Sequence, residues 1–362
     1  MRSIFGRINF TQNPFNSTIF TKSLESFFII PEVKKELAIE SHIGFGQVHC
    51  SSLTIKTNHA KDKNLIFVSD SIIYNKEKLA EILQLNQREI TDDEIILKSY
   101  EKWNEKCVEY LIGDFSFAIW NLEAKELFCA RDHLGVKPFH YYKDENCFVF
   151  STDIASILEQ DDLNFSLDDQ QVADTISIIK SEKFRTTYNE IKKLPPAHTL
   201  IIKNNKIEIK QYWELKPKKS LQKKDAEIIS EFKRILIESV RCRIRENQVI
   251  GSELSGGVDS STVTAIASSM IPIKTFSHVL PDRLIGKIHP FKDERGFINL
   301  LGDYCKITDR HFIKSEESLV KVIQNHIEES KNLIQQNFGL FSDQLYQTAM
   351  QEGTNILLSG FG

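Results

Sequence analysis

The pattern of apolar residues changes near Trp213, and this change constrains the fold more than any other feature of the 362-residue sequence. From Phe5 to Trp213 the apolar residues form short alternating or fully apolar runs separated by turn residues, a pattern typical of β-strands. The runs 200–203 and 206–210 flank two asparagines, which tolerate the left-handed conformation of a tight hairpin. The first half therefore predicts antiparallel sheets with a few helices, an α+β arrangement.

Beyond Trp213 the chain first becomes charged and then resumes an apolar pattern with a different period. Residues 214–225 are rich in lysine and contain Pro217, as expected of an exposed linker. Apolar residues at helical spacing then predict a helix with one buried face, carrying Ile228, Ile229, Phe232, Ile235, Leu236 and Val240. The predicted organisation is a domain of residues 1–213, a linker of residues 214–225 and a domain of residues 226–362.

The second domain alternates strand and helix patterns. Strands are expected at 249–254, 274–280, 310–313 and 355–358, and helices at 259–270, 293–304, 316–327 and 342–351. Strands separated by helices predict a parallel sheet, an α/β arrangement, with the ligand beyond the carboxyl ends of the strands. Two loops leave strands in that direction, at residues 255–261 and 359–362.

The composition argues against several function classes. The formal net charge is −4, so the chain lacks the basic field that drives association with nucleic acid, and no nucleic-acid partner is expected. No stretch reaches the roughly 18 apolar residues that span a bilayer, and residues 1–10 lack a secretory leader, so we expect a cytoplasmic protein with no membrane partner. The six cysteines form no Cys-x-x-Cys pair, which disfavours a zinc site and predicts free, mostly buried thiols.

The strongest chemical signal is the string LSGGVDSS at residues 254–261, between a predicted strand and a predicted helix. Gly256 and Gly257 let the backbone approach a bulky anion, the serines offer hydroxyl donors, and the helix N-terminus directs free N–H groups at the anion. Asp259 would repel a polyphosphate unless a cation intervened, so Mg²⁺ is the predicted metal. The alternative is an ordinary strand-to-helix turn in which a polar residue caps the helix.

This string resembles the pyrophosphate loop of the N-type ATP pyrophosphatases, and other segments extend the resemblance. The strings GDFSFAIW (113–120), RDHLGVKP (131–138), LPPAH (194–198) and QYW (211–213) are similar to motifs of the asparagine synthetase family in order and spacing. The resemblance implies an N-terminal class II glutamine amidotransferase-like domain, an Ntn-hydrolase-like antiparallel sandwich. It implies a C-terminal parallel-sheet domain of the adenine nucleotide alpha hydrolase-like type, which uses ATP.

The resemblance also implies site residues and cofactors. ATP and Mg²⁺ are the implied cofactors, and Asp259 is the implied metal ligand. The implied nucleotide-binding residues are Leu254, Ser255, Gly256, Gly257, Asp259, Ser260, Ser261, His278, Ser359 and Gly360. His278 would lie beside the adenine through its backbone, and for its side chain we favour a satisfied core histidine.

Three departures from the family pattern lie in the first half. An active glutaminase of this family needs an N-terminal cysteine nucleophile, but Arg2 stands in that place and the nearest cysteine is Cys50. Asp70-Ser71-Ile72 stands where the family has Asn-Gly-Glu, and the arginine that grips the glutamine has no counterpart around residues 44–47. We therefore assign no catalytic residue and expect an inactive glutaminase, as in beta-lactam synthetase and the lasso-peptide macrolactam synthetases.

Two features of the second half bear on substrate and completeness. Residues 328–333 do not resemble the segment with which asparagine synthetases read aspartate, so aspartate is not the obvious acceptor. The sequence ends at Gly362, just before the family's Gly-Asp-Glu, whose Asp is a second magnesium ligand. A fragment, a split-gene product and a degraded copy are the interpretations that remain open.

The leading functional hypothesis is an ATP-dependent amide-forming ligase that adenylates a carboxylate and releases pyrophosphate and AMP. One alternative is glutamine-hydrolysing asparagine synthesis. Another is a non-catalytic nucleotide-binding or partner-binding remnant. The expected partners are ATP with a carboxylate and amine substrate, and either a second copy or a separately encoded synthetase half. We interpret Arg131-Asp132-His133 as a structural turn, and Asp293-Glu294 as acidic residues of a first helical turn.

Overall fold

The computed structural model describes residues 2–14, 16–27, 33–50, 64–86, 90–179, 182–217, 223–245, 248–284, 293–314, 318–333 and 342–360. The chain divides into two compact units. The first comprises residues 1–216 with 327–335, and the second comprises residues 217–326 with 336–362. Part of the expected linker (218–222), the start of the expected helix at 316 and the end of the loop at 361–362 lie outside the described residues.

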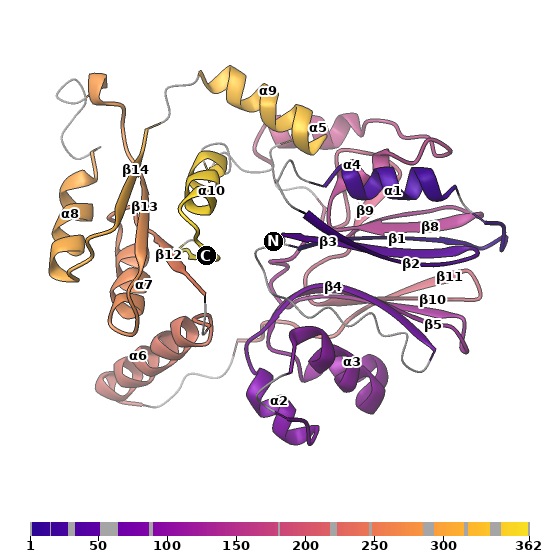
Figure 1. The fold of residues 1–362 in the computed structure, drawn as a ribbon, viewed down its shortest axis with the longest axis horizontal. Helices are drawn as coiled ribbons and strands as arrows, with labels where there is room; N and C mark the ends of the chain where they lie inside the picture. The colour runs from indigo at the N-terminus through magenta and orange to yellow at the C-terminus, as the bar shows by residue number, and fades with distance from the viewer. Residues whose placement is uncertain are drawn as a thin grey trace. The chain divides into compact units, whose positions relative to one another are not determined.

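Two antiparallel sheets form the first unit (Figure 1). The six-stranded sheet has the order β2 (Val33–Glu40), β3 (Ile43–Cys50), β1 (Arg2–Asn9), β8 (Cys147–Ser151), β7 (His140–Lys143) and β9 (Ile191–Lys193). The five-stranded sheet has the order β11 (Lys206–Gln211), β10 (His198–Lys203), β6 (Glu126–Arg131), β5 (Gly113–Asn121) and β4 (Leu65–Ile73). Asn204 and Asn205 join β10 to β11 with φ values of 50° and 60°, which confirms the predicted hairpin.

Helices cover the outer faces of this pair of sheets. The helices of this unit include α1 (Ser17–Glu25), α2 (Lys76–Ile82), α3 (Asp92–Trp103), the 3-10 helix η1 (Asn104–Glu109), α4 (Ile154–Leu158) and α5 (Asp169–Ile176). Apolar side chains pack in three layers: between α1, α4 and the six-stranded sheet, between the two sheets, and between the five-stranded sheet and α2 with α3. Both faces of β1 are buried for this reason. The predicted antiparallel sandwich is confirmed.

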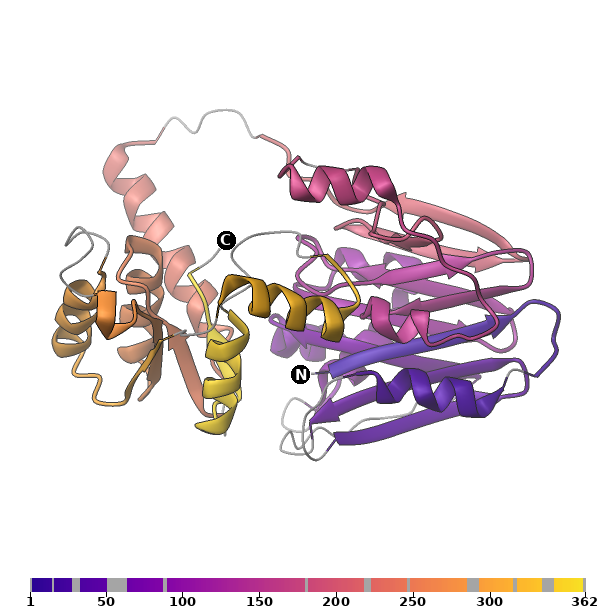
Figure 2. The same cartoon turned by 90° about the horizontal axis from the view of Figure 1, so that it is seen from above.

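The second unit contains a four-stranded parallel sheet. Its order is β14 (Arg310–Ile313), β13 (Lys274–His278), β12 (Ile250–Glu253) and β15 (Ile356–Leu358). The other elements are α6 (Asp225–Arg241), α7 (Val258–Ser268), η2 (Asp282–Leu284), α8 (Arg295–Tyr304) and α10 (Ser342–Gln351). Helix α9 (Leu319–Ser330) is divided, with residues 319–326 in this unit and residues 327–330 in the first. The predicted parallel sheet with intervening helices is confirmed. Figure 2 shows these elements from a second direction.

Helices pack on both faces of the parallel sheet. On one face α7 covers β12, and Ala267 of α7 packs with Ile250 and Leu358 of the sheet. On the other face Leu345 and Ala349 of α10 pack with Phe276. The carboxyl ends of the strands thus form an edge between two helical layers, where ligands bind in sheets of this kind.

The buried face predicted for α6 is wrong. Ile228, Ile229, Phe232 and Ile235 are 43–65% exposed, and Val240 is the buried residue of this helix. The helix forms as the apolar period predicts, but it packs against its neighbours only through its C-terminal end, where Val240 joins the core. Helical spacing predicts which residues share a face, and it does not say what covers that face.

Within the described residues, no helix has both the length and the hydropathy needed to cross a bilayer.

Candidate functional site

The loop between β12 and α7 leaves the parallel sheet at its carboxyl edge. Leu254, just after β12, is 1% exposed, and its backbone N–H donates a 3.0 Å hydrogen bond to the carbonyl of Phe276 in β13. The ladder therefore continues to Leu254, and the chain turns away from the sheet at Ser255. The structure thus places the predicted string 254–261 across the end of a buried strand and the first turn of a helix.

Gly256 makes the turn possible. Its φ of +83° lies in the left-handed region, which L side chains rarely adopt. A Cβ atom at this position would lie 3.0 Å from Cβ of Phe297 and 3.3 Å from the carbonyl oxygen of Glu294. The loop is therefore packed against the start of α8. Its conformation favours glycine, and a larger residue would also have to push Phe297 and Glu294 away by a few tenths of an ångström.

The serine hydroxyls brace the loop. The Oγ atoms of Ser255 and Ser260 lie 3.0 Å apart, and the backbone N–H of Ser255 donates to Oγ of Ser260 at 3.2 Å. The backbone N–H of Gly257 donates to Oγ of Ser255 at 3.3 Å. Ser260 is 8% exposed, whereas Ser255 is exposed. Two of the hydroxyls predicted as phosphate donors thus also fix the shape of the loop.

The first turn of α7 presents backbone donors at this edge. The amides of Val258, Asp259 and Ser260 belong to the first turn, where N–H groups have no acceptor within the helix. The positive end of the helix dipole lies at the same place and favours an anion. A hydrogen bond also ties α7 to the sheet, because Oγ of Ser252 in β12 lies 2.8 Å from Oγ1 of Thr264 in α7. Backbone donors on a fixed helix make a suitable cradle for phosphate.

The segment after β15 closes on the same turn. A Cβ atom at Gly360 would lie 2.5 Å from the backbone nitrogen of Ser260 and 2.7 Å from the carbonyl carbon of Asp259. Gly360 therefore lies directly against the start of α7, at a distance that no other residue allows. Its neighbour Ser359 donates a 2.7 Å hydrogen bond from Oγ to Oε2 of Glu253, at the end of β12. The structure brings the two predicted loops together.

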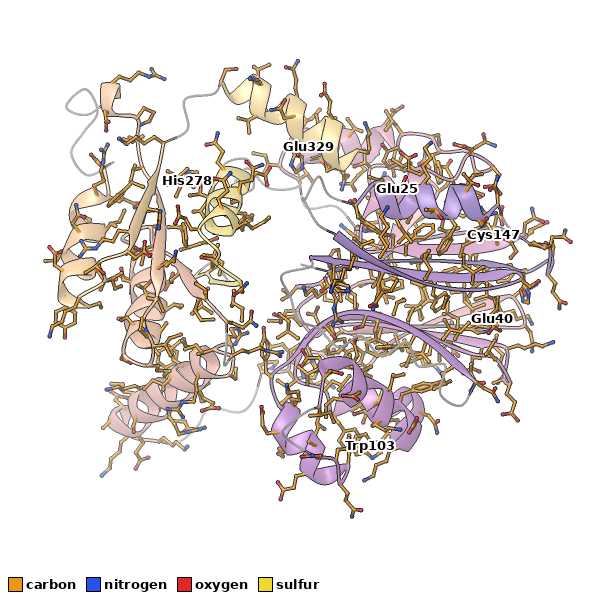
Figure 3. The ribbon with its side chains drawn as sticks, in the orientation of Figure 1. Glu25, Glu40, Trp103, Cys147, His278 and Glu329 are labelled. Carbon is orange, nitrogen blue, oxygen red and sulfur yellow. The ribbon has the colours of Figure 1, made fainter. Side chains whose placement is uncertain are left out.

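His278 ends β13, the strand next to β12 (Figure 3). It pairs with Ile313 of β14 and is half-buried. Parallel pairing places it at the same edge of the sheet as the loop.

Asp259 is exposed in the first turn of α7. Among the described residues no group of three or more histidine, cysteine, aspartate or glutamate side chains is arranged to hold a metal ion. Mg²⁺ is commonly held by only one or two protein carboxylates together with phosphate oxygens and water. A single exposed carboxylate beside a phosphate cradle fits that pattern.

In the first unit, the start of β1 carries a buried ion pair. Nη1 of Arg2 donates to Oδ1 of Asp93 at 2.7 Å, and their side chains are 6% and 1% exposed. The hydroxyl of Ser69 donates to the same carboxylate oxygen at 2.5 Å, and Oγ of Ser71 lies 3.0 Å from Oγ of Ser69. Burial opposes the charge of Arg2, but Asp93 more than offsets this and raises the pKa of the guanidinium.

Other groups near these strands are also engaged. The carboxylate of Asp70 forms a 2.7 Å ion pair with Lys137. Three thiols of the first unit, those of Cys107, Cys129 and Cys147, are buried, and burial raises the pKa of Cys107 and of Cys147 to about 12. A thiol with so high a pKa is a poor nucleophile at neutral pH. The side chain of Cys50 lies outside the described residues.

The Arg131-Asp132 pair shapes a turn, as predicted. Arg131 donates to the backbone carbonyls of Gly135, Lys137 and Leu194 at 2.7 Å each. The carboxylate of Asp132 accepts hydrogen bonds from the backbone of Leu134, Val136 and Lys137. All these acceptors and donors are backbone groups of the turn and its neighbours, so the role of the pair is structural.

The acidic pair before α8 was expected inside the first helical turn, and that expectation is wrong. The helix begins at Arg295, so Asp293 and Glu294 precede it. Oδ1 of Asp293 accepts a 2.9 Å hydrogen bond from Nε of Arg295. Arg295 also donates to the carbonyl of Leu280 and forms an ion pair with Asp282, so it ties the end of β13 to the start of α8.

The sequence interpretation missed two residues beside these sites, Asp93 and Glu253. Each makes its defining contact with a residue about 100 positions away, 91 for Arg2 with Asp93 and 106 for Ser359 with Glu253. The one local signal was a charged residue, Glu253, near the end of a predicted buried strand.

Two family models match this chain, one in each half of the sequence. Residues 35–213 match a family model described as a glutamine amidotransferase domain, and residues 231–362 match one described as asparagine synthase. The chain belongs to the asparagine synthetase family. It is 32% identical over 269 residues to a Methanocaldococcus jannaschii protein assigned to the glutamine-hydrolysing asparagine synthetases, and 29% identical over 254 residues to asparagine synthetase 3 of Bacillus subtilis.

These matches cover 73% and 66% of this asparagine synthetase family chain, and 51% and 41% of the relatives. The chain thus spans about half the length of the curated relatives it matches. Among solved structures, glutamine phosphoribosylpyrophosphate amidotransferase from B. subtilis aligns over 99% of this chain and 90% of its own, with 12% identity and a TM-score of 0.43. At that TM-score the likeness adds nothing to what the strand order establishes.

Proposed function

We propose that this protein uses ATP to activate a carboxylate for amide formation. A carboxylate oxygen of the substrate attacks the α-phosphorus of ATP, and pyrophosphate leaves. An amine then attacks the acyl carbon of the adenylate, loses a proton and displaces AMP. The reaction class follows from membership of the asparagine synthetase family, and the carboxylate and amine are left general because residues 328–333 do not resemble the family's aspartate-reading segment.

The observation that carries this proposal is the arrangement around the first turn of α7. Gly256 adopts a left-handed conformation, Gly360 lies against Ser260, and the backbone donors of the turn are left for an anion. A cradle of backbone N–H groups stabilises negative charge that builds up on a departing pyrophosphate. Leu254, Ser255, Gly257 and Ser261 complete the proposed nucleotide site.

Asp259 is the proposed ligand of Mg²⁺, which would shield the phosphates from each other and from this carboxylate. The exposed position of Asp259 beside the cradle supports this role. Ser359 and His278 are proposed to border the nucleotide, because they lie at the carboxyl ends of β15 and β13, the two strands that pair with β12.

The first unit is proposed to lack glutaminase activity. Arg2 occupies the start of β1, and its guanidinium is committed to a buried ion pair with Asp93. Asp70 pairs with Lys137 where the family has a glutamine-holding segment. Ammonia from glutamine would then not be the nitrogen source, and the amine would come from the substrate or from another protein.

The test is calorimetry with ATP and Mg²⁺, run beside an ATP–pyrophosphate exchange assay over a set of carboxylates. Binding with carboxylate-dependent exchange supports the ligase. Binding without exchange favours a nucleotide-binding remnant, and no binding rejects the site. Glutaminase activity of the purified protein would reject the assignment of the first unit and favour glutamine-dependent asparagine synthesis.

A further inference from the structure

Glu253 is an acidic residue in an unfavourable place for a carboxylate. It is the last residue of β12 and lies two positions before Ser255, beside the proposed phosphate site. A negative charge so close to a bound triphosphate would repel it. A carboxylate at this position therefore needs a compensating role, and the contacts of Glu253 supply one.

Glu253 faces away from α7. Side chains alternate along a strand, and Ser252 contacts Thr264 of α7, so Glu253 points to the face that carries α10. There its carboxylate lies close to Tyr346 of α10. Burial raises the pKa of this phenol, and the charge of Glu253 raises it further.

The carboxylate also holds the segment after β15. Oε2 of Glu253 accepts the 2.7 Å hydrogen bond from Oγ of Ser359, a contact between residues 106 positions apart. Hydrogen bonds to a charged acceptor are about twice as strong as neutral ones. The next residue, Gly360, lies against the backbone nitrogen of Ser260 in the first turn of α7. The position of Ser359 thus sets the position of the backbone that borders the cradle.

We propose that Glu253 is a positioning residue of the nucleotide site. Through Oγ of Ser359 it holds the backbone of Ser359 and Gly360 against the first turn of α7, and it does not itself contact the nucleotide. This inference rests on the proposed function, because it assigns a role within the same site. It adds a residue of β12 that lies on the opposite face of the sheet from α7.

Three variants test the proposal by their effect on the Kd of ATP. Ser359→Ala removes the donor and should weaken ATP binding about fivefold, the effect of one hydrogen bond. Glu253→Leu removes the acceptor and also the repulsion between its charge and the phosphates, so it should weaken ATP binding by less than Ser359→Ala does. Glu253→Gln keeps an oxygen acceptor and should bind ATP within about twofold of wild type. The double variant E253L/S359A should bind no more weakly than either single variant, because both remove the same contact.

Two further measurements separate positioning from general stability. The thermal midpoint of the nucleotide-free variants should match that of Glu231→Leu, a control at an exposed carboxylate on α6. Amide hydrogen exchange in residues 258–261 should be faster in E253L and S359A than in E253Q, in the absence of any nucleotide. That readout does not depend on ATP binding.

Each outcome has a definite meaning. If the wild-type protein does not bind ATP, the proposed function is rejected. Unchanged amide hydrogen exchange of residues 258–261 in the variants would then reject the positioning role as well. If wild-type protein binds ATP but E253L and S359A bind it equally well, the function stands and the role of Glu253 is rejected. If E253L lowers the thermal midpoint, the ATP affinities of S359A and E253Q test the proposal instead. Losses of ATP affinity that add up in the double variant would overturn it, because they would show that the two residues act independently.

Discussion

The guanidinium of Arg2 and the carboxylate of Asp93 meet at 2.7 Å, where the first strand begins and where α3 starts. The pair joins a strand of the six-stranded sheet to a helix that covers the five-stranded sheet. Ser69 of β4 donates to the same carboxylate, so three elements share one buried polar contact. The side chain of Arg2 is therefore committed to a structural contact inside the first unit.

Removing Asp93 should destabilise the first unit strongly. Asp93→Ala leaves the buried charge of Arg2 without its partner, which typically costs about 3–5 kcal/mol. Glu101→Ala, on the same helix, removes the partly exposed partner of Lys98 and should cost less than about 1 kcal/mol. Urea unfolding followed by tryptophan fluorescence compares the two. An equal loss of unfolding free energy in both variants would mean that the buried ion pair stabilises the protein no more than a surface ion pair does.

Gly256→Ala should destabilise the second unit and abolish nucleotide binding. Its left-handed φ costs an L residue about 1–2 kcal/mol, and the added Cβ would crowd Phe297. Gly353→Ala is the control for strain alone, because its φ is +73° and no atom lies within 4 Å of the added Cβ. Gly296→Ala, in α8 with open space, should be neutral or stabilising by up to about 1 kcal/mol. Thermal midpoints rank the three, and a tolerated Gly256→Ala would contradict the packing of the loop.

Local structure was largely visible in the sequence, because its signals are local. β14 and α10 begin and end where their patterns predicted, at residues 310–313 and 342–351. Two adjacent asparagines between strand patterns predicted the hairpin at Asn204 and Asn205. A glycine-rich string between a strand pattern and a helix pattern predicted the loop at Gly256. In each case the residues that determine the conformation are adjacent in the chain.

Contacts between distant segments were not visible. Nothing near Arg2 indicates that its partner lies 91 residues away, and nothing near Glu253 indicates Ser359. The same limit explains the error at α6, since the period of Ile228 and Phe232 predicts an apolar face without saying which element, if any, covers it. Side-chain pairing across a fold depends on topology, which the sequence pattern predicted only as a class.

Asp259→Asn should weaken binding of the magnesium complex of ATP about tenfold, because it removes the charge that would hold the cation. Without Mg²⁺, in EDTA, the same variant should bind ATP as well as or better than wild type, since the repulsion between carboxylate and phosphates is reduced. Asp303→Asn, at an exposed site on α8, is the control. Calorimetry in both conditions gives the comparison. Equal losses with and without Mg²⁺ would contradict a metal-binding role.

His140 should make the stability of the first unit depend on pH between about 3 and 6.5. Burial, together with the nearby charges of Arg131 and Lys193, lowers the pKa of His140 to about 3. In the unfolded chain this histidine takes up a proton near pH 6.5, so stability is lost as the pH falls below that value, by up to about 1.4 kcal/mol per pH unit. His140→Gln cannot take up the proton in either state and should flatten this part of the profile. Urea unfolding at several pH values measures both slopes, and equal slopes would show that His140 is not the group responsible.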